Sequence, residues 1–291
     1  MNFGRVITAM VTPFDEDLKV DFKALEKLIE HLISTGTDTL LVTGTTGESP
    51  TLSDEEKLEL FRASKAIAGN RAKIMAGTGT NSTQHSIDLS VEAEKIGVDG
   101  LLLVAPYYNK PTQAGLYKHF SMIAQAVDIP VVIYNVPGRT AVNVEPETLA
   151  KLSEIQNIVA VKDAAGNLDI TSKTRVLAPK LDIYSGDDSL TLPMLSVGGK
   201  GVISVASHVV GSEIKEMIES FEEEDTKKAE EIHLKLFPLF KTLFTITNPI
   251  PVKEALNMMG VKVGGFRPPM TPADEGVKEA IKKALKDLGK I

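Results

Sequence analysis

Short runs of continuous apolar residues alternate along the chain with longer segments in which apolar residues recur at helical spacing. The runs are Val6–Met10, Thr39–Val42, Lys73–Ala76, Gly100–Val104, Val131–Tyr134, Ile158–Val161, Leu181–Tyr184 and Gly201–Val205. Continuous rather than alternating apolarity is typical of strands that are buried on both faces, as in parallel sheets. The pattern therefore predicts a set of buried parallel strands separated by helices.

The segments between the runs carry helix signals. Phe22–Ile33 places its apolar residues on one face of a helix. Ser53 is a predicted N-cap, followed by glutamates that favour the first turn of a helix. Another predicted helix starts at Asn81 or Ser82 and ends at Gly97, a residue type that commonly stops helices.

The pattern changes after Val205, where no further strand is predicted. The helical segments that follow are Glu213–Glu224, Asp225–Thr245, Pro251–Met259 and Thr271–Leu288, with a connector rich in glycine and proline at Gly260–Pro269. The first of these segments completes the last strand–helix unit, and the other three form a C-terminal helical extension. We therefore expect a catalytic barrel over residues 1–224 and the extension over residues 225–291.

The spacing of the strands selects the fold. Successive strand ends recur about every 28 residues, which fits an α/β chain folded as a (β/α)₈ TIM barrel of ~250 residues. A doubly wound sheet shows the same alternation and is the main alternative. Its dinucleotide fingerprint is missing, because Gly77–Ser82 lacks the third glycine, and no GxxxxGK[ST] motif occurs. The sequence therefore favours the barrel.

Composition excludes several functions for this chain of 291 residues. A net charge of −7 leaves no surplus of Lys and Arg to neutralise nucleic-acid phosphates. The absence of cysteine excludes disulfides, Fe–S clusters, thiolate zinc sites and thiol nucleophiles, and the five scattered histidines form no HExxH motif. Met1–Thr12 lacks a signal-peptide pattern, and no apolar run of about 18 residues occurs. We expect no membrane association and, by default, a cytoplasmic location.

Candidate chemistry lies where strands end, because barrel function resides in the loops that follow the strands. Lys162 directly follows an apolar strand. In an apolar pocket its neutral amine would be favoured and could attack a carbonyl to form a Schiff base. The alternative is a lysine whose stem is buried while its ammonium reaches water. Tyr134 ends the neighbouring strand, where its phenol could move protons to and from such an amine, or could merely fill space.

Two further segments could bind carboxylates. Gly44-Thr-Thr-Gly-Glu48 combines two hydroxyls with free backbone N–H groups, which suits a small anion, although it could be only a glycine-rich turn. Arg139 offers a planar guanidinium for bidentate binding, unless it is simply a solvated loop residue. Together with Lys162 and Tyr134, these residues predict a Schiff-base lyase or aldolase that acts on small carboxylated carbonyl compounds.

The same residues carry a family resemblance over essentially the whole chain. The chain resembles the dihydrodipicolinate synthase (4-hydroxy-tetrahydrodipicolinate synthase) family, within the larger N-acetylneuraminate lyase group of barrels. The matching segments are Gly4–Pro13, Gly44–Glu48, Pro106–Asn109, Tyr134–Thr140, Val161–Asp163, Ser185–Asp188 and Gly201–Val205. Arg139 is the more specific mark of the synthase branch. The resemblance implies a lyase that condenses pyruvate with L-aspartate 4-semialdehyde to 4-hydroxy-tetrahydrodipicolinate, on the route to diaminopimelate and lysine.

The resemblance also implies a role for each site residue. Lys162 forms the imine with pyruvate, and a proton relay consists of Tyr134, Thr45 and Tyr108, the last from a neighbouring subunit. The substrate-binding residues are Thr46 for the pyruvate carboxylate, Arg139 for the semialdehyde carboxylate, and Gly186 and Ile203 through backbone atoms. No metal or organic cofactor is implied, because the protonated imine is itself the electron sink. The implied assembly is a homotetramer built as a dimer of dimers.

Two other functions stay open. One is a pyruvate-imine lyase of the same group that cleaves a sugar acid. Arg139 disfavours it, because an extended polyol requires hydroxyl partners where the synthase has a guanidinium. The other is a catalytically silent barrel that binds carboxylates, which the joint presence of Lys162 and Tyr134 disfavours.

A candidate effector cleft follows from the same resemblance. Feedback-inhibited members bind L-lysine at a dimer interface, in a cleft whose counterpart here contains Ser49, Lys57, Asn81, His85 and Tyr107. Lys57 takes a histidine position, and His85 stands where a glutamate binds the effector's amine. Because lysine is a cation at pH 7, losing that carboxylate and gaining an ammonium weakens its attraction. We expect weak or absent inhibition by L-lysine, unless Asp54 or Glu55 supplies a substitute carboxylate.

Overall fold

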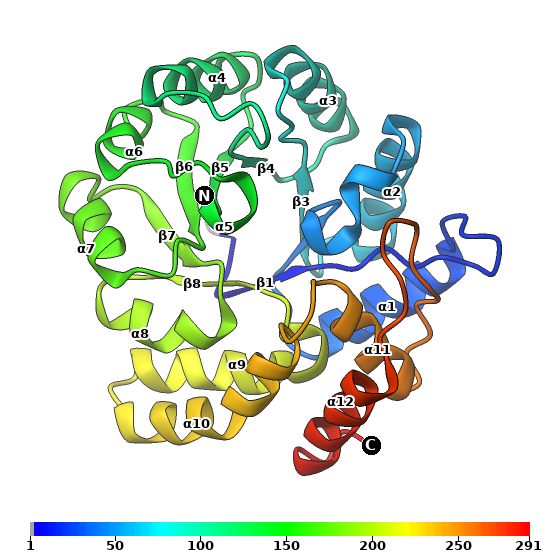
Figure 1. The fold of residues 1–291 in the computed structure, drawn as a ribbon. Helices are drawn as coiled ribbons and strands as arrows, with labels where there is room; N and C mark the ends of the chain where they lie inside the picture. The colour runs from blue at the N-terminus through cyan, green and yellow to red at the C-terminus, as the bar shows by residue number, and fades with distance from the viewer. Residues whose placement is uncertain (1–2) are drawn as a thin grey trace.

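Eight parallel strands pair in chain order and close into a barrel, because β1 pairs with both β2 and β8 (Figure 1). The computed structural model describes residues 3–291, so the first two residues of the predicted 1–224 unit and of the Met1–Thr12 segment lie outside the described residues. The strands are β1 (Val6–Ala9), β2 (Thr39–Val42), β3 (Lys73–Gly77), β4 (Gly100–Val104), β5 (Val131–Asn135), β6 (Ile158–Asp163), β7 (Asp182–Ser185) and β8 (Gly201–Ser204). Every predicted strand is present, with ends shifted by at most two residues.

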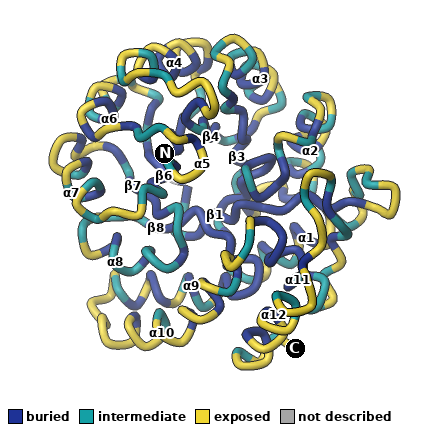
Figure 2. Tube along the Cα trace, viewed as in Figure 1, coloured by how far each residue is buried: buried dark blue, intermediate teal, exposed yellow. Residues whose placement is uncertain are grey.

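The strands are continuously apolar because two separate cores cover their two faces. One face of each strand packs inside the barrel, in a cluster that includes Ile7, Met75 and Val132. The other face packs against the surrounding helices in a larger cluster. Figure 2 shows the resulting buried centre inside a ring of helices whose outer faces are exposed. The predicted TIM barrel is confirmed.

Helices connect the strands and form the ring around them. The α-helices are α1 (Phe22–Ser34), α2 (Asp54–Ala68), α3 (Thr83–Ile96), α4 (Gln113–Gln125), α5 (Pro137–Thr140), α6 (Pro146–Leu152), α7 (Leu168–Leu177), α8 (Thr191–Ser196), α9 (Ser207–Glu222), α10 (Thr226–Thr242), α11 (Ile250–Met258) and α12 (Glu275–Asp287). Short 3₁₀ turns are η1 (Thr45–Gly47), η2 (Ser49–Thr51) and η3 (Asp188–Leu190). Within residues 3–291, no helix is both long and apolar enough to cross a membrane.

The predicted helix caps have a clear local cause. Ser53 caps α2 in a reciprocal arrangement with Glu56, in which each side chain accepts a hydrogen bond from the other residue's backbone N–H. Ser82, rather than Asn81, caps α3. Gly97 ends α3 in the left-handed region, with φ of 85°. These ends were predictable because each cap lies next to its helix in the sequence.

The start of α9 was predicted wrongly. The sequence pattern placed it at Glu213, whereas the helix begins at Ser207 and contains one non-helical residue, Val210. The Asp188 carboxylate accepts hydrogen bonds from the backbone N–H groups of Val205 (3.1 Å) and Ala206 (2.9 Å). A group from the preceding strand–helix unit therefore holds the two residues that lead into this helix. No local pattern could show that contact.

The C-terminal helices pack beside the last barrel unit. α10 contacts α9, and α12 contacts both α10 and α11 (Figure 1). The predicted division between residues 224 and 225 falls in the short turn between α9 and α10. That division stays a prediction.

A buried neutral histidine ties α9 to the end of β1. The His208 ring Nε2 accepts a hydrogen bond from the Val11 N–H (3.1 Å), and its Nδ1 donates to the Val205 carbonyl (2.8 Å). Both ring nitrogens are therefore used in the neutral form. Burial lowers the pKa of His208 from 6.5 to about 4, and burial also lowers that of His119 to about 4.

We expect the protein to lose stability as the pH falls from 8 to 5. The pKa of His208 is lower in the folded state than its ordinary 6.5, so the unfolded chain binds the proton first and stability falls below pH 6.5. The contribution of His208 is about 2 kcal/mol over this range. Urea unfolding at both pH values should show a pH-dependent loss about 2 kcal/mol larger for the wild type than for His208→Gln, which retains a donor and an acceptor. Equal losses in the two proteins would contradict this assignment.

Candidate active site

The register of the barrel places Lys162 beside Tyr134. Lys162 on β6 is the direct partner of Tyr134 on β5. The Lys162 Nζ lies 4.2 Å from the centroid of the Tyr134 ring, and the lysine is only 5% exposed. The amine is thus held inside the barrel against an aromatic face, not extended into water.

This environment favours an uncharged amine. Burial is the largest effect on Lys162 and lowers its pKa from 10.5 to about 7. The Asp188 carboxylate opposes this change, and the Arg139 guanidinium adds to it. Near neutral pH a large fraction of the amine is therefore unprotonated, which is the form that attacks a carbonyl.

Tyr134 remains a phenol at neutral pH. Burial raises its pKa to about 12, while Arg139 and a hydrogen bond with the Thr45 side chain oppose the rise. The phenol can therefore give a proton and take it back through Thr45, which belongs to the η1 turn. The structure thus brings Tyr134, Thr45 and Lys162 together, as the sequence predicted.

The Gly44–Glu48 loop is held in a strained conformation at both ends. Thr43, which precedes the loop, has φ of 57°, and Glu48 at its end has φ of 55°. Residues other than glycine rarely adopt this left-handed region. The Thr43 hydroxyl donates to the Gly77 carbonyl at 3.0 Å, which holds the first strained residue. Within the loop Thr46 is 2% exposed. The loop is a rigid element that fixes both threonines.

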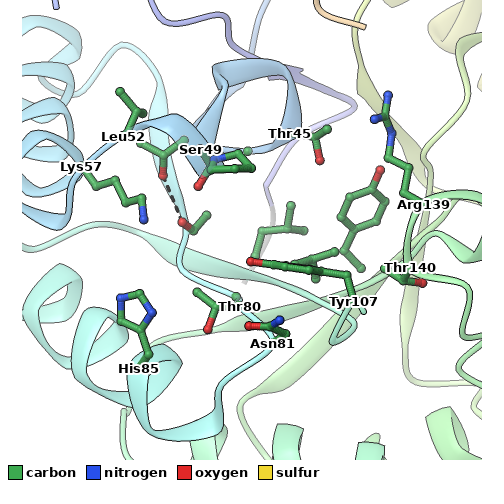
Figure 3. Close-up of a pocket in the computed structure, with 18 of the residues that line it drawn as sticks. Thr45, Ser49, Leu52, Lys57, Thr80, Asn81, His85, Tyr107, Arg139 and Thr140 are labelled. Carbon is green, nitrogen blue, oxygen red and sulfur yellow. Dashed lines mark hydrogen bonds between the residues drawn. The ribbon is translucent and has the colours of Figure 1, made fainter. Parts of the chain in front are cut away.

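A cavity of about 600 Å³ opens beside these groups. Figure 3 shows Thr45 and Arg139 at one side of it, Lys57 and His85 at the other, and Tyr107 between them. Tyr134 also lines the cavity. Lys162, Thr46, Gly186 and Ile203 lie outside the lining, with Ile203 on β8 only 1% exposed inside the barrel. The predicted substrate-binding residues are therefore divided between the cavity wall and the interior behind it.

Gly186 is required because its backbone packs closely against Ala164 and the Lys162 side chain. A Cβ atom at Gly186 would lie 3.2 Å from Lys162 Cε and 2.7 Å from Ala164 Cβ. The Gly186 N–H donates to the Asp163 carbonyl at 2.8 Å, which holds this backbone against β6. A larger residue would have to displace Ala164 and would press on the lysine stem. The glycine therefore acts through the space it leaves.

Tyr108 does not enter the cavity of its own chain. It is 90% exposed and has φ of 72°, whereas the adjacent Tyr107 lines the cavity. The loop is fixed by the Asn109 side-chain amide, which donates to the Asn81 carbonyl at 2.8 Å. The predicted relay is thus incomplete within one chain.

The residues of the candidate effector cleft form a charged cluster around Asp54. One Asp54 oxygen lies 3.1 Å from Lys57 Nζ, and the other lies 2.7 Å from His85 Nε2. Hydrogen bonds from both partners lower the pKa of Asp54, against the opposing effect of burial, which is the largest single influence. Asp54, one of the two acids expected to be able to supply a substitute carboxylate, is therefore already paired inside the cleft.

Sequence reasoning missed two residues of the C-terminal extension that reach the site. The Asn248 amide donates to the Thr46 hydroxyl oxygen at 2.9 Å, and Lys253 Nζ forms an ion pair with Glu48 at 2.9 Å. A lysine among the apolar residues of Ile250–Leu256 was the available signal for Lys253. Asn248 carries no comparable signal.

Metal ligation was tested on side-chain arrangement. In the part of the chain that the structure describes, no group of three or more His, Asp or Glu side chains is arranged to hold a metal ion.

Comparisons with known proteins agree on one family. The family model described as "Dihydrodipicolinate synthetase family" matches residues 2–288. A protein from Desulforudis audaxviator named 4-hydroxy-tetrahydrodipicolinate synthase is 54% identical over 288 residues, which cover 99% of this chain and 98% of that protein.

Solved structures show the same similarity. Dihydrodipicolinate synthase from Bacillus anthracis has a TM-score of 0.96 at 46% identity, with 98% of each chain covered. The synthase from Cyanidioschyzon merolae, whose structure has lysine bound, has a TM-score of 0.97 at 46% identity, with 99% of each chain covered.

Proposed function

The chain belongs to the dihydrodipicolinate synthetase family and condenses pyruvate with L-aspartate 4-semialdehyde to 4-hydroxy-tetrahydrodipicolinate, in diaminopimelate and lysine biosynthesis, and we propose that Lys162 carries this reaction. The observation that supports the assignment is the burial of Lys162 against Tyr134, which favours its neutral amine. The full-length relatives named as synthases speak against the sugar-acid lyase and the silent barrel.

The proposed chemistry begins at the amine. The neutral Nζ of Lys162 attacks the keto carbon of pyruvate, and loss of one water leaves a protonated imine. The imine withdraws electrons, so a proton leaves the pyruvate methyl group, and the resulting enamine attacks the aldehyde carbon of the semialdehyde, whose oxygen takes up a proton to become the 4-hydroxyl group. The amino group of the semialdehyde then attacks the re-formed imine carbon, which closes the ring as a cyclic imine and releases Lys162 Nζ as a free amine. Tyr134 and Thr45, which are hydrogen-bonded, move the protons that these steps release and consume.

The two substrate carboxylates have separate proposed partners. Thr46, in the rigid Gly44–Glu48 loop, holds the pyruvate carboxylate, with Gly186 and Ile203 contributing backbone atoms. Arg139 lies on the cavity wall and can bind the semialdehyde carboxylate through two parallel hydrogen bonds. In this proposal pyruvate lies next to Lys162 and Thr46, inward of the cavity wall that carries Arg139.

A second copy of the chain completes the proposed relay. Tyr108 is almost fully exposed and adopts a strained left-handed conformation, so the loop projects the ring away from its own chain. We propose that it enters a partner's site and that the protein is a homotetramer built as a dimer of dimers. The cytoplasmic location stays a prediction.

Borohydride reduction in the presence of pyruvate should leave a covalent adduct on Lys162. Lys162→Arg should abolish it, because a guanidinium stays charged. Substitution of an exposed lysine, Lys110→Arg, should not abolish it. Mapping the adduct to another lysine by peptide mass spectrometry would refute the mechanism.

The rate should also depend on pH through this amine. Because the pKa of Lys162 is about 7, kcat/KM for pyruvate should rise about tenfold from pH 6 to pH 8.

Mixing two inactive variants tests the role of Tyr108. Tyr108→Phe and Lys162→Ala chains should recover about a quarter of wild-type activity after random exchange, because half of the dimers are hybrids with one intact site each. Tyr134→Phe mixed with Lys162→Ala is the control and should recover nothing. Tyr134 and Lys162 both serve the site of their own chain, so every site in a hybrid dimer still lacks one of them. Verified hybrids without activity would place Tyr108 in its own subunit's chemistry.

L-lysine should inhibit weakly or not at all, because Asp54 is already paired with Lys57 and His85. The measurement is a lysine titration of the initial rate at subsaturating pyruvate. A Lys57→His/His85→Glu double variant, which restores the regulated family pattern, should gain inhibition. Sub-millimolar inhibition of the wild type would show that the cleft binds lysine through another acid.

A further inference from the structure

Two residues of the C-terminal extension contact the loop that carries Thr45 and Thr46. Asn248 lies just before α11, and Lys253 lies within it. They meet residues about 200 positions earlier in the chain, Thr46 and Glu48. The extension therefore reaches the loop next to the amine.

Lys253 is a buried cation whose hydrogen-bonding capacity is fully used. Its side chain is 0% exposed. The Nζ donates to Glu48 Oε1 (2.9 Å), to the Thr12 carbonyl (3.0 Å) and to the Gly265 carbonyl. It also lies 4.5 Å from the centroid of the Phe14 ring. Three donors with three acceptors define one position for this ammonium and for the carboxylate that it binds.

The Glu48 carboxylate in turn fixes the end of the loop. Its second oxygen accepts a hydrogen bond from the backbone N–H of Arg267 at 3.1 Å. The Glu48 backbone is in the left-handed region and its N–H donates to the Thr45 carbonyl at 3.1 Å, which closes the η1 turn. Without a partner, the buried carboxylate would favour a conformation in which Glu48 reaches water, and the strained backbone would relax. The ion pair keeps the turn closed.

Asn248 determines the direction of the Thr46 hydroxyl. Its Nδ2 donates to the Thr46 Oγ1 at 2.9 Å, and both residues are buried. A hydroxyl that accepts in this way has its own hydrogen free to donate elsewhere. Within residues 3–291, that hydrogen reaches no protein acceptor. Asn248 Oδ1 is also buried without a partner in the described chain.

We infer that Asn248 and Lys253 are positioning residues for pyruvate: Lys253 holds the turn through Glu48, and Asn248 directs the Thr46 hydroxyl at the pyruvate carboxylate. This inference rests on the proposed function, since it takes Thr46 as the carboxylate partner next to Lys162. The C-terminal extension is then part of the active site.

A double-mutant cycle tests Asn248. Asn248→Ala should raise the KM for pyruvate about tenfold, the size of one lost hydrogen bond to a charged group, and change the KM for the semialdehyde less than twofold. Because Asn248 acts through one hydroxyl, Asn248→Ala/Thr46→Val should be no worse than Thr46→Val alone. Effects that multiply in the double variant, or a lower melting temperature with an unchanged pyruvate KM, would overturn the inference.

The matched test for Lys253 removes both charges of the pair together. Lys253→Met alone leaves a buried, unpaired carboxylate and can fail to fold, so the variant to assay is Glu48→Gln/Lys253→Met. It should raise the pyruvate KM at least fivefold while the semialdehyde KM changes less than twofold. Lys290→Met, which breaks the pair between this residue of the extension and Glu213 on α9, should leave both KM values unchanged. Equal effects of the two variants would assign Lys253 a purely structural role.

Two results distinguish failure of the proposed function from failure of the positioning role. If wild-type enzyme gives no borohydride adduct on Lys162, the proposed function fails. If that adduct forms but the pyruvate KM of the Asn248 and Lys253 variants stays at the wild-type value, only the positioning role fails.

Discussion

The site depends on keeping one lysine amine out of water. Lys162 is buried at the end of β6 and its pKa falls to about 7, because desolvation outweighs the nearby Asp188 carboxylate. The barrel makes this possible, since strands covered on both faces can bury a side chain near the axis without exposing backbone groups. Tyr134 is at the paired position of the next strand, and Gly186 leaves the space that the lysine stem occupies. The strand register, the glycine at position 186 and burial thus all help to hold the Lys162 amine out of water.

The loop that is proposed to bind the pyruvate carboxylate is held in a strained conformation near this amine. The Gly44–Glu48 loop is bounded by two strained residues, Thr43 and Glu48. Strain of this kind persists only where surrounding contacts over-determine the conformation. Here those contacts come from the Thr43 hydroxyl bond to Gly77 and from the buried pair with Lys253 in α11. The conformation of the Gly44–Glu48 loop therefore depends on its contact with the C-terminal extension.

The cavity joins the proposed substrate site to the candidate effector cleft. Thr45 and Arg139 line one part, Lys57 and His85 line the other, and Tyr107 lies between them. Charge distinguishes the two ends. Near Arg139 a guanidinium is available to an anion, whereas the Asp54 carboxylate is paired internally with two nitrogen bases. One continuous hollow can thus favour anionic substrates while offering little to a cationic effector.

The sequence by itself determined the barrel and the neighbouring positions of Lys162 and Tyr134 in the proposed site. Eight continuously apolar runs predicted the strands. Tyr134 ends one of these runs and Lys162 directly follows the next, so both could be placed at the ends of neighbouring strands. Local caps such as Ser53 and Gly97 were predictable for the same reason. The start of α9, the Asn248–Thr46 hydrogen bond and the Lys253–Glu48 pair were not, because each joins residues that are distant in the chain. Only the packing of neighbouring strand–helix units, and of the C-terminal extension against the Gly44–Glu48 loop, brings those partners into contact. A linear pattern records burial and periodicity, whereas a buried polar pair becomes favourable only once folding has removed both groups from water.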